Sequence, residues 1–139
     1  MSTPLPKIAT DTPERTGEPL VSIVDDDVSV RRSALRLLRT SGLRVAAFGS
    51  AEDFLQSGHV EETACLLLDV RMPGMNGLEL QRRLVESVRH VPIIFLSARA
   101  SEEEERQAWR AGAVNFLRKP VSKELLLHSI NAVLNSTPQ

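Results

Sequence analysis

The recurrence of short apolar runs constrains the fold of this chain more than any other feature of its sequence. The runs are five or six residues long and lie at 20–24, 43–48, 64–68, 92–96 and 113–117. This length is typical of β-strands, and apolar residues at successive positions are typical of strands that are buried on both faces of a sheet. The sequence therefore predicts five buried strands.

The segments between the runs carry signals of amphipathic helices. In the first segment apolar residues recur at helical spacing from Val30 to Leu38, and Gly42 occupies the position of a C-terminal cap. Four more helices are predicted. Three of them begin after Ser50, Ser101 and Ser122, and the other covers 77–88. Ser50 and Ser101 are each followed three residues later by an acid, which predicts a capping box at both. The chain therefore alternates strand and helix five times.

This alternation predicts how the strands are connected. Right-handed crossovers between successive strands give a parallel sheet with helices on both faces. We therefore predict an α/β fold with a doubly wound, five-stranded parallel sheet of the flavodoxin-like (βα)5 type. In the common strand order 2-1-3-4-5, the first and third strands are neighbours, and ligands bind beyond their carboxyl ends.

Acidic residues follow the two strands that this order places side by side. Asp25, Asp26 and Asp27 come after the first strand, and Asp69 comes after the third. Adjacent carboxylates repel one another, so they require a positive group nearby. A helix N-terminus is one such group, because aspartates often cap helices and complement the helix dipole. A hard cation such as Mg²⁺ is the other, because Asp25, Asp26 and Asp69 would offer it a cluster of oxygen ligands.

Two further polar residues follow the remaining strands of the predicted sheet. Ser97 comes directly after the fourth strand, and Lys119 comes two residues after the fifth. Each residue alone is readily explained, as a loop serine and as a surface lysine. Together with the carboxylates at the same edge of the sheet, a hydroxyl and an ammonium group fit the recognition of a phosphoryl group.

Composition argues against several other classes of function. The 139 residues carry a net charge of −1, so bulk charge does not favour nucleic acid as a partner. No apolar stretch is long enough to cross a membrane. Cys65 is the only cysteine, and its apolar setting indicates a buried thiol in a protein of the reducing cytoplasm. The three histidines lack ligand spacing and there is no glycine-rich phosphate loop, so no cofactor other than Mg²⁺ is expected.

The length of the chain predicts one domain with a flexible segment at each end. Residues 1–19 contain four of the eight prolines and show no hydrophobic period, so we expect a disordered extension there. The extension also lacks the apolar block of a signal peptide. We expect the domain to cover 20–135 and a flexible tail to cover 136–139.

Four motifs give the sequence a strong resemblance to a known family. They are "IVDDD", "LLLDVRMPGMNG", "FLSA" and "FLRKP", in this order. Residues 20–135 resemble the receiver domain of two-component response regulators, and "DVRMPGMNGLEL" with "AGAVNFLRKP" resembles the FixJ-like subgroup. The resemblance implies a signalling module that phosphorylation controls. It implies no enzyme activity beyond the domain's own phosphotransfer and autodephosphorylation.

The resemblance also assigns roles to the residues at the strand ends. Asp69 would accept the phosphoryl group from a phosphohistidine of a sensor histidine kinase or phosphotransfer protein. Asp25 and Asp26 would hold Mg²⁺ together with Asp69 and the backbone carbonyl of Arg71. Lys119 would pair with the phosphoryl group.

A second set of implied roles concerns switching. Ser97 would hydrogen-bond the phosphoryl group, and Phe116 would change position when the domain is activated. The Lys119–Pro120 peptide bond would be cis. The fourth helix and the fifth strand would bind a downstream protein, and a homodimer that depends on phosphorylation is a further assembly to consider.

The fourth helix is expected to be the most weakly anchored element of the fold. No apolar residue occurs from Ser101 to Gln107, so its first turns can bury little surface. Its docking would then depend on Ala108, Trp109 and Ala111. The alternative interpretation of "EEEER" is a solubilising face on a rigid helix.

Two other functions are compatible with parts of this pattern. A Mg²⁺-dependent phosphatase of the haloacid dehalogenase type also uses an aspartate nucleophile beside a strand. That family needs a second acid two residues after the nucleophile, where this chain has Arg71. The chain is alternatively the receiver part of a DNA-binding transcriptional regulator whose helix-turn-helix is absent from this sequence, because FixJ-like receivers often precede such a domain.

Overall fold

The computed structural model describes residues 17–87 and 90–136, in which strands and helices alternate as predicted. The strands are β1 (Leu20–Val24), β2 (Arg44–Phe48), β3 (Thr63–Leu68), β4 (Ile93–Ser97) and β5 (Asn115–Arg118). The helices are α1 (Val28–Thr40), α2 (Ala51–Gln56), α3 (Gly77–Glu86), α4 (Glu102–Arg110) and α5 (Lys123–Ser136). Most of the predicted extension and tail lies outside the described residues. Among those that are described, no helix has both the length and the apolar character needed to cross a membrane.

The strands form one parallel sheet in the order β2-β1-β3-β4-β5, which confirms the predicted topology. β1 and β4 are buried at every position, as their continuous apolar sequences indicate. The direction of winding reverses between β1 and β3, which are hydrogen-bonded neighbours. Their carboxyl ends therefore meet at the point where sheets of this type bind ligands.

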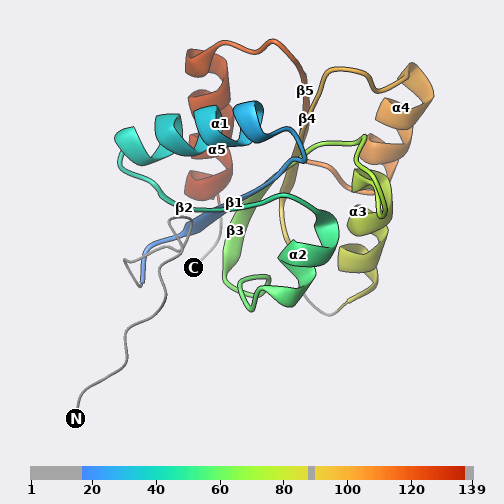
Figure 1. Ribbon diagram of the computed structural model, residues 1–139, viewed down its shortest axis with the longest axis horizontal. Helices are drawn as coiled ribbons and strands as arrows, with labels where there is room; N and C mark the ends of the chain where they lie inside the picture. The colour runs from blue at the N-terminus through green and yellow to red at the C-terminus, as the bar shows by residue number, and fades with distance from the viewer. Residues whose placement is uncertain (1–16, 88–89, 137–139) are drawn as a thin grey trace.

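Helices cover both faces of the sheet (Figure 1). On one face α1 and α5 bury Leu38 and Ile130 in a core that they share with the sheet. On the other face α2, α3 and α4 bury Phe54, Leu80 and Ala108 in a second core. Burial of apolar surface on both sides, at about 25 cal/mol per Å², makes the sheet the rigid frame of the molecule.

Several strand boundaries differ from the prediction by one or two residues, and those of β4 and β5 bear on the site. β5 begins at Asn115 rather than at Ala113, because the Ala113 N–H donates to the Ala108 carbonyl and so completes the turn that ends α4. β4 includes Ser97, so this serine is the last residue of the strand. Lys119 likewise follows β5 directly. Both residues are therefore held closer to the regular sheet than the sequence analysis expected.

Local signals fix the ends of several helices. Ser101 and Glu104 form the predicted capping box at the start of α4. Gly42 follows α1 with a φ of +88°, a left-handed conformation that glycine adopts without strain. α3 ends at Glu86, and its predicted end at Val88 lies outside the described residues.

α4 contributes only one buried residue, Ala108, to the second core. The prediction that Trp109 also docks the helix is wrong, because Trp109 is 45% exposed. Its indole N–H donates instead to Glu105 Oε2 over 3.2 Å. Ala111 is half-buried. Since apolar packing is so limited, polar contacts carry much of the attachment of α4.

Candidate functional site

The predicted site residues meet at the carboxyl ends of four neighbouring strands. Asp25 follows β1, Asp69 follows β3, Ser97 ends β4 and Lys119 follows β5. Backbone hydrogen bonds continue the sheet beyond the strand ends. The Asp69 N–H donates to the Val24 carbonyl over 3.1 Å, and the Lys119 N–H donates to the Ser97 carbonyl over 3.0 Å. The sheet therefore fixes the backbone from which these side chains project.

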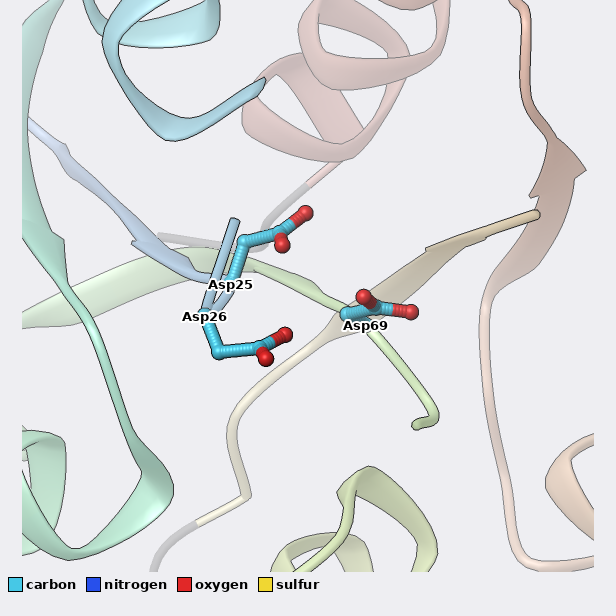
Figure 2. Close-up of side chains that lie close together, drawn as sticks. All are labelled: Asp25, Asp26 and Asp69. Atoms are coloured by element: carbon cyan, nitrogen blue, oxygen red, sulfur yellow. The ribbon is translucent and has the colours of Figure 1, made fainter. Parts of the chain in front are cut away.

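Three carboxylates form the acidic centre of the site (Figure 2). One oxygen from each of Asp25, Asp26 and Asp69 lies within 4.8 Å of the other two. Asp25 and Asp69 are buried, whereas Asp26 is exposed. The side chain of Asp27 accepts a hydrogen bond from the Val30 N–H and caps α1. The acidic run therefore does both things that its sequence allows, because one member caps a helix and two belong to an oxygen cluster.

Lys119 is the positive group that faces this cluster. Its ammonium donates a hydrogen bond to Asp25 Oδ2 over 2.8 Å and lies 3.7 Å from Asp69 Oδ2. The side chains of Lys119 and Asp25 are only 17% and 5% exposed, so solvent screens the pair weakly. The Lys119–Pro120 peptide bond is cis, as predicted. One ammonium group thus balances a buried carboxylate and approaches a second.

The oxygen atoms of the cluster fit a hard divalent cation. Asp25 uses Oδ2 for Lys119 and uses Oδ1 to accept the Asp27 N–H over 2.9 Å. Asp26 and Asp69 are therefore the carboxylates with the more available oxygens. Mg²⁺ usually binds proteins through one or two carboxylates and takes its other ligands from water or phosphate. The donor set of the site matches this requirement.

Burial raises the pKa of the Asp69 carboxyl above its ordinary value of 3.8, and the neighbouring charge of Asp25 raises it further. The ammonium of Lys119, a hydrogen bond from the Arg71 backbone and the nearby Ser97 hydroxyl oppose this shift without cancelling it. The ionised form of Asp69 is therefore less favourable in the folded chain than in water. A cation bound beside it would relieve that disadvantage.

The Ser97 hydroxyl makes no hydrogen bond of normal geometry within the described part of the chain, although it lies near enough to Asp69 to lower the pKa of that carboxyl. The residue is fully buried, and its Oγ has no hydrogen-bond partner among the described residues. A buried polar atom without a partner costs about 1–3 kcal/mol and therefore needs an explanation. An oxygen-rich group bound at the strand ends would provide the missing acceptor.

Phe116 is buried one strand away from Ser97. Its ring stacks on Phe95 of β4 with a centroid separation of 5.6 Å, and the Arg118 guanidinium lies 5.3 Å from its centroid. Phe116 and Phe95 are register partners in neighbouring strands. The aromatic residue that the resemblance links to switching therefore packs directly against the strand that ends in Ser97.

A cavity of about 310 Å³ lies over the acidic cluster. Its lining consists of Asp26, Asp27, Asp69, Arg71, Ala98, Arg99 and Lys119. Arg99 did not emerge from the sequence analysis, although it stands two residues after Ser97. With Arg71 and Lys119 it places three cationic side chains around the acidic centre, which suits a ligand with several negative charges.

Gly77, at the start of α3, is the last residue of the motif "LLLDVRMPGMNG", and the sequence alone assigned it no role. Its N–H donates to the Val70 carbonyl over 2.9 Å. A Cβ atom at this position would lie 2.2 Å from the Asp69 carbonyl oxygen, which is an impossible approach. Glycine therefore allows α3 to begin directly against the backbone of Asp69.

Two charged residues outside the motifs support the loops of the site. Arg31 Nη1 donates to the Asp25 carbonyl over 2.8 Å, and so ties α1 to the loop that carries the acidic run. Glu52 Oε2 accepts the Met75 N–H over 3.1 Å and ties α2 to the loop that follows Asp69. Neither contact leaves a signal in the sequence, because each joins segments whose proximity depends on the complete fold.

Comparison with known proteins identifies the family of this chain. Residues 21–131 match the response regulator receiver domain. Nodulation protein W of Bradyrhizobium diazoefficiens is 43% identical over 119 residues, which make up 86% of this chain and 52% of that protein. The chain spans about half the length of the curated relatives it matches.

Solved structures agree with this match. The response regulator receiver protein from Burkholderia phymatum has a TM-score of 0.74 and 39% identity, and the match covers 88% of this chain and 100% of that one. FixJ-N has a TM-score of 0.79 and 31% identity, and the match covers 89% of this chain and 99% of that one.

Receiver domains are parts of signalling proteins in two-component systems, in which response regulators interact with histidine kinases and downstream effectors. They generally bind Mg²⁺ at an acidic pocket, and the cluster of Asp25, Asp26 and Asp69 is consistent with such a pocket. The matched region, the strand order and the relatives thus lead to one conclusion: the chain belongs to the response regulator receiver domain family, and FixJ is among its relatives.

Proposed function

We propose that Asp69 accepts a phosphoryl group from a phosphohistidine of a sensor histidine kinase or phosphotransfer protein. The observation that carries the proposal is the convergence of Lys119 and Ser97 near Asp69. Lys119 supplies a cation 3.7 Å from Asp69 Oδ2, and Ser97 supplies a buried hydroxyl that acts on the Asp69 carboxyl without making a hydrogen bond of normal geometry to any described residue. Phosphoryl oxygens would satisfy both groups.

In the proposed reaction a carboxylate oxygen of Asp69 attacks the phosphorus atom in line with the leaving imidazole. A P–O bond forms as the P–N bond of the phosphohistidine breaks, and the bonding electron pair leaves with the imidazole nitrogen. Lys119 neutralises charge on the phosphoryl oxygens during this transfer. Attack of water on the acyl phosphate later releases inorganic phosphate and restores Asp69. The proposed catalysis is limited to these two steps.

We infer that Mg²⁺ is held by the carboxylates of Asp26 and Asp69 and by the backbone carbonyl of Arg71, with Asp25 supporting the site. When bound, the ion would neutralise charge on the transferred group. Asp25 is the least available ligand, because both of its oxygens already accept hydrogen bonds. Its part in the proposal is to hold Lys119 and to complete the negative field around the ion.

We further propose that Ser97 and Phe116 relay phosphorylation to a partner-binding face on α4 and β5. Support comes from the stacking of Phe116 on β4 and from the weak apolar anchoring of α4. A helix with few buried contacts has low local stability and can be shifted by modest free energies. A downstream protein is the proposed occupant of this face, and a second phosphorylated copy of the chain is the other candidate.

A second candidate function is that of the receiver part of a DNA-binding transcriptional regulator. It is favoured by the names of two relatives, the transcriptional regulatory proteins TdiR and FixJ, and by the share of their length that the match covers, 50% and 56%. Under this proposal the receiver controls DNA binding without touching nucleic acid itself, which agrees with its net charge of −1.

We place the chain in the cytoplasm and away from the membrane. The proposal rests on the buried thiol of Cys65, the only cysteine, whose pKa burial raises to about 12. Such a thiol is inert and has no partner cysteine for a disulfide. A cytoplasmic location is also where a kinase that uses ATP would supply the phosphoryl group.

Chemical labelling tests the proposed function. The natural chain, incubated with acetyl phosphate and Mg²⁺, should gain one phosphoryl group by intact mass, and Asp69→Asn should gain none. Asp27→Asn is the matched control, because asparagine preserves the cap of α1, and it should be labelled like the natural chain. Equal labelling of Asp69→Asn and the natural chain would exclude Asp69 as the acceptor.

A further inference from the structure

α4 is attached to the molecule in an unusual way. Its nine residues bury only Ala108, and its first turn carries four consecutive glutamates, Glu102, Glu103, Glu104 and Glu105. At its C-terminal end, the buried Gln81 side chain donates to the Ala108 carbonyl over 3.0 Å. The N-terminal half of the helix has no comparable buried contact among the described residues, so its position depends on what the glutamates bind.

Glu104 binds the loop that follows the phosphorylation site. Its Oε1 accepts hydrogen bonds from Arg71 Nη2 and from the Ser101 N–H, both over 2.9 Å. Arg71 stands two residues after Asp69 and lines the cavity of the site. Arg71 lowers the pKa of Glu104, together with the hydrogen bond from Ser101, which is the larger cause. This ion pair joins the start of α4 to the segment that carries the phosphoacceptor.

Glu105 binds the end of β5. Its Oε1 accepts a hydrogen bond from Arg118 Nη2 over 2.8 Å. Arg118 also donates from Nη1 to the Ala100 carbonyl over 2.7 Å and lies over the ring of Phe116. Arg118 directly precedes Lys119 in the chain. This second ion pair joins α4 to the strand that carries the lysine of the site.

We propose that the two pairs, Glu104–Arg71 and Glu105–Arg118, are the ties that hold the N-terminal half of α4, and that a phosphoryl group on Asp69 releases the first by drawing Arg71 away. The release step rests on the proposed function, whereas the ties do not. A guanidinium pairs more strongly with a phosphoryl dianion than with a carboxylate, because the dianion offers more charge and more oxygen acceptors. The Arg71 side chain is 54% exposed, so it has room to move.

Glu103, in the same turn of α4, provides a matched control. Glu103 pairs with Arg106 three residues later, within α4 itself, over 2.9 Å. Its replacement removes the same charge from the same turn and breaks an ion pair of the same length, yet it frees no second element. Any effect that is specific to the ties should therefore appear in Glu104→Gln and Glu105→Gln and be absent from Glu103→Gln. Glutamine at 104 also keeps the capping box with Ser101.

Amide hydrogen exchange of the full chain without phosphodonor tests the ties. Each of Glu104→Gln and Glu105→Gln should speed exchange over 102–107 by about 1.5- to 5-fold, the effect expected of one exposed ion pair on a locally opening segment. The double variant should multiply the two effects, whereas Glu103→Gln should speed exchange less than either single variant, because it loses only a first-turn charge and an ion pair within the helix. Exchange in Glu104→Gln and Glu105→Gln that equals exchange in Glu103→Gln would overturn the proposal.

Exchange after labelling with acetyl phosphate and Mg²⁺ tests the release step. Labelling should speed exchange over 102–107 more in the natural chain than in Glu104→Gln, whose first tie is already broken. A labelled natural chain with unchanged exchange, or an equal increase in both chains, would overturn the release step, while the proposed acceptance of a phosphoryl group by Asp69 would stand. Absence of labelling by intact mass would instead contradict the proposed function and the release step together.

Discussion

Lys119 donates a hydrogen bond to Asp25 Oδ2 over 2.8 Å, although 94 residues separate the two in the sequence. The contact spans the sheet from the end of β5 to the end of β1, past the ends of β3 and β4. The flexible four-carbon side chain of lysine can bridge such a span. The charge of the buried Asp25 carboxylate is therefore balanced by an ammonium group that reaches in from the far side of the site.

Replacement of Lys119 by methionine should destabilise the chain at pH 7 in the absence of Mg²⁺. It leaves Asp25 buried without its ionic partner, so we expect a loss of about 1–3 kcal/mol, less than for a fully buried pair. Urea unfolding measures the effect. Lys123→Met, at an exposed position of α5, is the control and should change stability by less than about 0.5 kcal/mol. Equal losses in both variants would show that the ammonium of Lys119 does not balance the cluster.

Asp69→Asn should be more stable than the natural chain at pH 7. The pKa of Asp69 is raised in the folded state, so the folded chain keeps a proton that the unfolded chain releases as the pH rises above about 3.8. Stability is therefore lost as the pH rises through the window between the unfolded and folded pKa values, and the full deficit is present at pH 7.

Unfolding by urea at several pH values, without Mg²⁺, checks this prediction. The advantage of Asp69→Asn should be largest at neutral pH and should shrink as the pH falls toward the ordinary pKa of an aspartate. Mg²⁺ should reduce the advantage, because it binds the folded natural chain more tightly than it binds folded Asp69→Asn and so stabilises the natural chain more. An advantage that does not change with pH would mean that the Asp69 charge is not its source.

Asp26 and Asp27 should differ sharply in their effect on Mg²⁺ binding. Asp26→Ala removes a proposed direct ligand. Loss of a residue that only supports a ligand already weakens metal binding about 10-fold, so Asp26→Ala should weaken Mg²⁺ binding by at least that factor. Asp27→Ala should leave the affinity nearly unchanged, because Asp27 caps α1. Isothermal titration calorimetry measures both variants. The reverse ranking would show that the residues that face the ion are misassigned.

Much of the fold followed from sequence because two signals are local. Continuous apolar runs predict strands buried on both faces, and alternation with helices leaves few topologies. The features of the fold that were not predicted depend mostly on contacts between segments. β5 begins late because Ala113 completes the turn after α4. Asn76 and Glu79 form a capping box that the sequence analysis did not single out, although their spacing carried the signal. At Ser50 only half of the predicted capping box forms, namely the hydrogen bond that the Asp53 N–H donates to Ser50 Oγ.

The candidate site was predictable as a set of residues, because parallel strands bring their carboxyl ends to one edge of the sheet. The pairing within that set was not predictable. Nothing local distinguishes Asp25, which binds Lys119, from Asp26, which leaves its oxygens more available. The pair of Arg71 with Glu104 joins segments 33 residues apart and depends on where α4 packs. The sequence also misled on Trp109, because an aromatic residue in a polar helix need not dock.

Gly77→Ala should destabilise the chain and disturb Asp69 at once. The added Cβ would lie 2.2 Å from the Asp69 carbonyl oxygen, so the start of α3 or the backbone of Asp69 must move. We expect a loss of about 1–3 kcal/mol in urea unfolding, as for an overpacked core, and slower labelling by acetyl phosphate. Gly49→Ala is the control, because the atoms nearest to its Cβ would be those of the flexible end of the Arg31 side chain, at 3.2 Å and beyond, which can shift. Labelling of Gly77→Ala at the natural rate would mean that the start of α3 moves to accommodate the Cβ and that Asp69 keeps its position.

Ser97→Ala should leave the unphosphorylated chain as stable as the natural one or more so, and should still impair its response to phosphate. The Ser97 hydroxyl is buried without a partner among the described residues, so its removal relieves a penalty of about 1–3 kcal/mol instead of breaking a hydrogen bond. Ser22→Ala is the matched control. Ser22 is equally buried, in β1, but its Oγ shares a hydrogen bond of 2.8 Å with Thr63, and its loss should therefore destabilise the chain.

Urea unfolding compares the two variants, and hydrogen exchange over 102–107 after labelling reports the response, which should be smaller in Ser97→Ala than in the natural chain. If Ser97→Ala proved as destabilising as Ser22→Ala, its hydroxyl would already have a partner in the unphosphorylated protein, and the argument that it awaits a phosphoryl oxygen would fail.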